Sequence, residues 1–152
     1  NGTLPPTTRA AESPAPNNFE GKTIILSENI HLNNKEWTPI GNESARFHGT
    51  FDGKGHTIYG LSILKYHGQR QHALFGSVAI NPTIKNLIID GANVIMPEGH
   101  DDDFYASALI SSFYGTLKVQ NVTVQNSNFA GNNKIGGLLA HDAECTSMII
   151  DN

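Results

Sequence analysis

One short stretch of the chain, residues 100–105, gathers side chains that could bind a ligand. It holds an imidazole, His100, the consecutive carboxylates Asp101, Asp102 and Asp103, and the aromatic pair Phe104 and Tyr105. Carboxylates are hard oxygen ligands that suit Ca²⁺, and together with aromatic rings they could equally contact a sugar or a protein. The simplest interpretation is that the aspartates keep a long loop solvated. No cofactor is expected, although Ca²⁺ at Asp101–Asp103 stays an alternative.

Two other segments carry candidates for the same binding surface. These are Tyr66, His67, Arg70, His72, Asn132, Asn133 and Lys134. Cleavage of a glycoside needs two carboxylates on one face, roughly 5–10 Å apart. The aspartate triplet with Arg70 or Lys134 could supply parts of such a site, so an enzyme resembling pectate lyases or glycoside hydrolases is one alternative. No second acidic cluster is spaced to stack on the first, which favours a non-catalytic role.

These segments connect repeating units. Each unit has a small-residue and leucine element followed by a strand-like run: 73–76 with 84–89, 108–111 with 119–124, and 137–140 with 150–152. One position of the repeat, which we call the asparagine slot, is occupied by Gly60, Asn86, Asn121 and Asn152. These residues are 26, 35 and 31 positions apart, a spacing typical of solenoids. The runs are short, alternating and β-branched. The sequence therefore predicts an all-β, right-handed parallel β-helix of about four coils.

In a β-helix, equivalent positions of neighbouring coils stack on one another, so the repeats predict which side chains form columns in the interior. The expected columns are Ile58, Ile84, Val119 and Ile150; Leu61, Leu87 and Val122; Ile63, Ile89 and Val124; and Leu74, Leu109 and Leu138. Amides at a repeated tight turn can bond to the equivalent amides on neighbouring coils. We therefore interpret Asn86, Asn121 and Asn152 as a structural ladder rather than as catalytic groups.

The connections between units vary in length at one corner. From the second strand-like run to the next leucine element the distances are 11 residues (63 to 74), 20 (89 to 109) and 14 (124 to 138). In repeat proteins, insertions at one position project from one face, which is often the binding face. All the candidate ligand-binding residues lie in these insertions.

Composition limits the partners. Residues 1–18 are rich in Pro, Ala and Thr and predict an extended arm or linker, so the repeat domain spans 19–152. The formal net charge is −4 and no basic stripe is present, which argues against nucleic acid. No apolar run approaches the ~20 residues that cross a bilayer, which argues against membrane insertion.

The most specific motifs are W-T-P-I-G at 37–41, F-H-G-T-F-D-G-K-G-H-T-I at 47–58 and A-L-F-G at 73–76. Through them the chain resembles the GLUG-repeat family of bacterial β-helical surface domains. We expect structural roles for Trp37, Gly41, Gly49, Asp52, Gly53 and Gly55, with Phe47 and Phe51 pointing inward. The resemblance implies modules of adhesins and non-catalytic regions of secreted peptidases, and it supplies no catalytic set.

The function expected from these features is a non-catalytic module of a secreted or surface-displayed bacterial protein. It would present a rigid face for adhesion to a glycan or protein. A structural stalk, or a non-catalytic region of a larger secreted peptidase, is a further alternative. The C-terminal unit stops at Asn152, whose side-chain amide should bond to the equivalent amide of another coil. We therefore expect a cut or uncapped end. Further repeats in cis, or a second copy, would cover it.

Overall fold

The computed structural model describes residues 18–66, 68–95, 104–131 and 134–151, and no helix occurs among them. The chain forms short strands connected by turns. The strands are β1 (Thr23–Ile25), β2 (Ile30–His31), β3 (Thr50–Asp52), β4 (Thr57–Tyr59), β5 (Ser62–Ile63), β6 (Gln71–His72), β7 (Phe75–Ala79), β8 (Thr83–Asp90), β9 (Asn93–Ile95), β10 (Tyr105–Ala106), β11 (Ile110–Gln125), β12 (Asn128–Ala130), β13 (Lys134–Ile135) and β14 (Leu139–Asp151).

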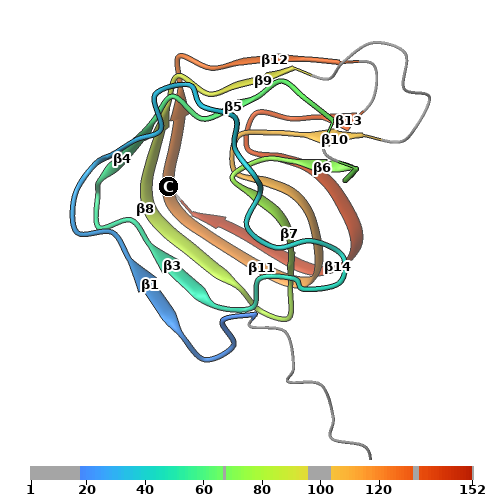
Figure 1. Cartoon of the computed structure of the whole chain (residues 1–152). Coiled ribbons are helices and arrows are strands. Elements are labelled where there is room, and N and C mark those ends of the chain that lie inside the picture. Colours follow the sequence, from blue (N-terminus) through green and yellow to red (C-terminus); the bar gives the residue numbers. More distant parts are fainter. Residues whose placement is uncertain (1–17, 67, 96–103, 132–133, 152) are drawn as a thin grey trace, which may run out of the picture.

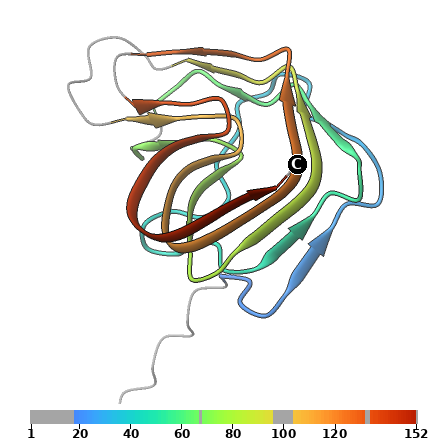
Figure 2. The same cartoon turned by 180° about the vertical axis from the view of Figure 1, so that it is seen from behind.

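The strands stack as a right-handed parallel β-helix, which confirms the predicted fold class (Figures 1 and 2). One sheet follows the order β1-β3-β8-β11-β14, and smaller sheets follow β12-β9-β5 and β13-β10-β6. The coils that begin with β3, β8 and the second half of β11 contribute to all three sheets. A shorter coil containing β1 and β2 precedes them, and the end of β14 begins the next level.

The core consists of the expected columns in its later coils. Ile84 pairs with Val119, and Val119 pairs with Ile150, so these side chains follow one another along the solenoid. Leu87 pairs with Val122 in the same way. Ile84, Leu87 and Val119 are at most 1% exposed. Each such aliphatic side chain stabilises the fold by roughly 1.5–3 kcal/mol through burial.

The alignment of the second coil was wrong. Residues 53–56 form a turn, with two more residues between Asp52 and Thr57 than between their partners Lys85 and Ile88. Consequently Ile58 stacks on Ile89 instead of Ile84. Gly53, whose amide donates to the carbonyl of Lys85, occupies the asparagine slot in place of Gly60.

The residues after this turn are shifted with it. Ile63 stacks on Val94 of β9 instead of Ile89, because Ser62 pairs with Asn93. The amide of Gly60 donates to the carbonyl of Asp90, so Gly60 lies at the corner beside Gly91. Leu61, expected above Leu87, likewise lies one corner further along, where its carbonyl accepts from the amide of Asn93. The two additional residues in the turn between β3 and β4 therefore moved a whole set of side chains to new columns.

Aromatic side chains fill the first coils. Phe47 and Phe51 are 1% and 4% exposed, which confirms their predicted inward orientation. Their ring centroids lie 5.0 and 5.4 Å from that of Phe75, within the favourable range for aromatic pairs. Trp37 packs partly buried against both hydrophobic clusters, and its indole N–H donates to the carbonyl of Leu74 at 3.2 Å. These contacts join the first coil to the second.

Replacing Ile80 by asparagine is expected to raise the free energy of unfolding by about 1 kcal/mol. Ile80 has a φ of 56°, a left-handed conformation that is unfavourable for a β-branched residue. It is 63% exposed, so little packing is lost on substitution. Urea unfolding at pH 7 measures the change. The same substitution at Ile25, which is 55% exposed but lies within β1, should not stabilise the protein.

Candidate binding surface

The strands that flank the three variable connections lie at one corner of the β-helix. β5, β9 and β12 form one small sheet, and β6, β10 and β13 form the next (Figure 1). Each variable segment joins a strand of the first sheet to a strand of the second. The candidate residues Tyr66, His72, Tyr105 and Lys134 therefore come together, although they are distant in the sequence.

An aromatic cluster underlies this corner. The ring of Tyr66 contacts that of Phe104 edge-on with centroids 5.4 Å apart, and the ring of His72 contacts Phe104 at 5.6 Å. His72 and Phe104 are only 1% and 4% exposed, whereas Tyr66 is 37% exposed. The Nδ1 atom of His72 lies 3.2 Å from the carbonyl oxygen of Arg70. Burial corrects the expectation for His72: its ring belongs to the packing beneath the surface.

Tyr105 is also better described as a packing residue. It is 9% exposed, and its ring stacks on that of His141 with centroids 4.3 Å apart. The Nζ atom of Lys134 lies 5.0 Å from the centre of the Tyr105 ring, a cation–π arrangement that holds the lysine over the corner. The sequence did not reveal this burial, because both neighbours of the tyrosine ring come from other coils.

Among the candidate residues that the structure describes, Tyr66, Arg70 and Lys134 are exposed. Their positions are fixed from beneath. The carboxylate of Glu36 accepts hydrogen bonds from the amides of Leu64 and Lys65 at 3.0 Å, which anchors the segment before Tyr66. The carbonyl of Arg70 accepts from the Tyr105 amide at 2.9 Å. The corner thus presents the ring of Tyr66 and the cations of Arg70 and Lys134, with the exposed Lys65 beside them.

Seven of the candidates lie outside the described residues, as does one ladder residue. The candidates are His67, His100, Asp101, Asp102, Asp103, Asn132 and Asn133, and the ladder residue is Asn152. The Ca²⁺ hypothesis at Asp101–Asp103 therefore stays a prediction. Among the residues that the structure describes, no three His, Cys, Asp or Glu side chains converge as ligands of a metal ion would.

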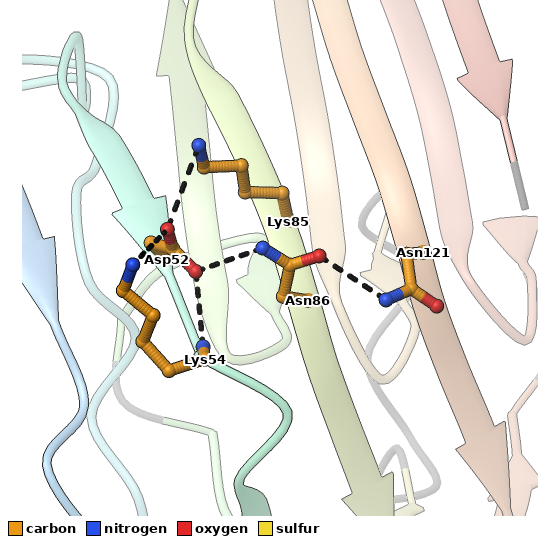
Figure 3. A network of polar contacts seen from close by, with 5 residues as sticks. All are labelled: Asp52, Lys54, Lys85, Asn86 and Asn121. Carbon is orange, nitrogen blue, oxygen red and sulfur yellow. Dashed lines mark hydrogen bonds and ion pairs between the residues drawn. The ribbon is translucent and has the colours of Figure 1, made fainter.

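A second polar arrangement lies on the outer face, where the asparagine slots stack (Figure 3). The side-chain amide of Asn121 donates to the oxygen of Asn86 at 3.1 Å, so a ladder forms between these coils. Asn86 in turn donates to Oδ1 of Asp52 at 3.0 Å, and the amide of Lys54 donates to the same oxygen. The Nζ atoms of Lys54 and Lys85 lie 3.6 and 3.5 Å from Oδ2. A carboxylate therefore ends the ladder.

These contacts lower the pKa of Asp52 to about 2. The hydrogen bond from Asn86 is the largest cause, followed by the amide of Lys54 and the charges of Lys54 and Lys85, while burial opposes the shift. Hydrogen bonds from Asn126 and Gln125 lower the pKa of Asp90 in the same way. A general acid requires the opposite shift. We interpret both carboxylates as links between coils.

Asp52→Asn is expected to lower the free energy of unfolding at pH 7 by about 1–2 kcal/mol, because hydrogen bonds to a charged group become bonds to a neutral one. In the parent chain the folded-state pKa of Asp52 lies below its ordinary value of 3.8. The stabilisation is therefore complete above about pH 4 and is lost as the pH falls toward 2. Urea midpoints measured between pH 6 and pH 2 should fall less steeply for the variant.

The pKa of Asp90 is also lowered in the folded state, so the Asp52→Asn variant should still lose some stability in acid. This loss should decrease further when Asp90→Asn is added. Equal pH profiles for the parent and both variants would contradict the assigned network.

Comparison with known proteins gives two partial similarities. The chain is 35% identical over 102 residues to a halomucin of Haloquadratum walsbyi, covering 66% of the chain and 1% of that protein. It is 28% identical over 137 residues to a protein of Evansella cellulosilytica named as a Gly-rich membrane protein, covering 70% of the chain and 15% of the relative. The chain therefore spans a small part of these curated relatives. No family model matches, and no solved structure matches significantly.

The described part of the chain contains no helix long and apolar enough to cross a membrane. Neither relative carries a name that denotes an enzyme. The β-helical fold, and relatives named as a halomucin and as a Gly-rich membrane protein, are compatible with a non-catalytic repeat at a cell surface.

The position of Asp52 at the end of the ladder was not predicted from the sequence. Asp52 was assigned a structural role only through the F-x-G-x-F-D-G motif, and its contact with Asn86 was not foreseen. A usable signal was present, because Asp52 directly precedes the glycine that fills the asparagine slot of the second coil. The shifted alignment of that coil hid it.

Proposed function

We propose that this chain is a non-catalytic repeat module of a secreted or surface-displayed bacterial protein, and that its variable corner binds a glycan or a protein. The observation that carries the proposal is the grouping of Tyr66, Arg70 and Lys134 on one corner of a rigid solenoid. Parallel coils hold the corner through backbone hydrogen bonds, so binding would require little ordering of the protein.

The chemistry of the corner favours a partner with negative charge. Arg70 and Lys134 are exposed cations, and guanidinium groups bind carboxylates and sulfates through paired hydrogen bonds. Tyr66 offers a ring that is 37% exposed, and its contact with buried Phe104 holds that ring in place. An acidic polysaccharide, or an acidic surface of a protein, matches these groups.

The triple variant Tyr66→Ala, Arg70→Ala, Lys134→Ala is expected to weaken binding to an acidic polysaccharide at least about tenfold, equivalent to about 1.4 kcal/mol. A glycan array containing uronate-rich and sulfated polymers identifies the probe, and titration then measures the affinity. The matched control is Lys22→Ala with Lys35→Ala, which removes exposed cations from the first coil. Equal losses in both variants would indicate nonspecific charge attraction and contradict the proposal.

The same polysaccharides test the two alternatives. Release of new reducing ends or unsaturated uronides, abolished by Asp102→Asn, would replace the binding module by an enzyme. An empty glycan array, together with an empty screen against acidic proteins, would leave the role of a structural stalk.

A further inference from the structure

The tripeptide Asn42-Glu43-Ser44 matches the N-x-S/T pattern at which asparagine side chains receive N-linked glycans. An acceptor asparagine has to lie at the surface, because the glycan is bulky and is delivered by an enzyme. All three residues of the tripeptide are exposed, and they lie in a loop without strand structure. The folded chain therefore presents this motif to solvent.

The loop that carries the tripeptide projects because it is longer than its counterpart in the next coil. The residues that flank it, Ile40 and Phe47, are seven positions apart, whereas the residues of β7 to which they bridge are only three positions apart. Additional residues at one position of a repeat project outward from the coil. The Nε2 atom of Gln71 donates to Oε1 of Glu43 at 2.9 Å, which ties the projecting loop to β6.

The side chain of Asn42 is held with its amide nitrogen available. Its Oδ1 atom accepts hydrogen bonds from the backbone amides of Ser44 and Ala45, both at 2.9 Å. The backbone amide and carbonyl of Asn42 also bond to those of Ala45, at 3.1 and 3.2 Å, so the segment closes as an Asx turn. The turn uses only the oxygen of the side chain. Since no described residue accepts a hydrogen bond from Nδ2 of Asn42, that nitrogen is available to an incoming group.

The other sequence matches in the described chain differ from Asn42 in this respect. Asn121 begins the tripeptide N-V-T, but its Nδ2 atom lies within β11 and donates to Oδ1 of Asn86 at 3.1 Å. Asn81 is followed by Pro82, and proline at the central position is incompatible with the pattern. A further match at residues 1–3 lies outside the described residues. The structure therefore favours Asn42 over Asn121 as an acceptor.

We propose that Asn42 is the acceptor of an N-linked glycan. In this reaction Nδ2 forms a bond to the anomeric carbon of a lipid-linked oligosaccharide diphosphate. The bond from that carbon to the diphosphate oxygen breaks, the diphosphate leaves with the electron pair, and one hydrogen of the Asn42 amide leaves as a proton that a base of the transferring enzyme takes up. The Oδ1 atom keeps its two hydrogen bonds, so the turn is preserved in the product. The proposal rests on the secreted or surface-displayed location in the proposed function, but not on a ligand of the variable corner.

The test incubates the purified, folded chain with an oligosaccharyltransferase of N-x-S/T specificity and a lipid-linked oligosaccharide. Asn1→Gln is present throughout, so that this residue carries no glycan. Trypsin releases Asn42 in the peptide 36–46 and Asn121 in the peptide 119–134, and mass spectrometry measures the glycan-bearing fraction of each. We expect this fraction to be at least about tenfold higher for Asn42, because the ladder and the strand have to open before Asn121 reacts.

Substitutions of Ser44 separate the motif from the turn. Ser44→Ala keeps the backbone amide that donates to Oδ1 of Asn42 but removes the hydroxyl, so it should abolish the modification, whereas Ser44→Thr should preserve it. Asn86→Ala removes the acceptor of the Asn121 side chain and should raise the modified fraction at Asn121. An unmodified peptide 36–46 in the folded parent chain, or equal modification of the two asparagines, would overturn the proposal.

The peptide 36–46 of the protein recovered from its natural source distinguishes this proposal from the proposed function. A glycan on Asn42 in the extracellular or cell-surface fraction supports both. An exported chain whose peptide 36–46 is unmodified overturns the glycan assignment and leaves the surface module intact. Recovery of the chain from the cytoplasm alone, without a glycan, overturns both.

Discussion

Replacing Phe75 by alanine is expected to lower the free energy of unfolding by about 3–5 kcal/mol. The Phe75 side chain is fully buried, and it contacts Phe47 of the first coil and Phe51 of its own coil. Its backbone pairs with Ile110, so the ring lies where three coils meet. Alanine leaves a cavity that the surrounding parallel strands cannot close, because their backbones are fixed by hydrogen bonds on both sides.

Urea unfolding at pH 7 measures this effect, with Phe75→Leu as the matched control. Leucine retains most of the buried apolar volume and is expected to destabilise the protein by less than about 1.5 kcal/mol. Because each coil is stabilised by its neighbours, the alanine variant should also speed amide exchange in β3 and β8. A small change for Phe75→Ala, similar to that for Phe75→Leu, would contradict the assigned core.

Gly41→Ala is expected to lower the free energy of unfolding by about 3 kcal/mol or more, among the large effects of single substitutions. Gly41 has a φ of +76°, and a Cβ atom there would lie 2.5 Å from the carbonyl oxygen of Ser77. This oxygen accepts the amide of Phe47, so it cannot move without breaking a contact between coils. The W-T-P-I-G motif therefore ends in glycine because of both conformation and close backbone approach.

Gly91→Ala separates these two causes. Gly91 has a φ of +70°, but a Cβ atom would meet nothing within 4 Å. Its replacement should show only the conformational effect of roughly 1–2 kcal/mol. Differential scanning calorimetry of the two variants measures the difference, which is the contribution of the crowding at Ser77. Similar losses for both glycines would show that φ alone explains the motif.

The sequence predicted the corner at which the connections vary in length, but not the orientation of the side chains there. The variable distances before Leu74, Leu109 and Leu138 placed the insertions correctly between the two small sheets. His72 and Tyr105 were nevertheless counted with exposed residues, because polar and aromatic residues in a variable segment are often at the surface. Their burial depends on Phe104 and His141, which reach them from neighbouring coils.

Within the core, the sequence predicted the alignment of the later coils but not that of the second coil. Units with matching spacing, such as 84–89 and 119–124, aligned correctly because a period of two residues fixes which side chains face inward. The second coil contains the turn at residues 53–56, whose extra length a sequence repeat cannot place. The positions of Ile58, Leu61 and Ile63 therefore required the register observed in the sheet.

The sequence by itself determined the class of fold and the corner that varies, since alternating β-branched runs and periodic asparagines depend on local backbone preferences. Only the tertiary structure decided which polar groups are paired. Asp52 meets Asn86 and Lys85 across a coil boundary, 34 and 33 positions away in the sequence. The same holds for the exposed candidates at the corner, because parallel stacking places Lys134 at the same corner as Tyr66 and Arg70, two coils away from them.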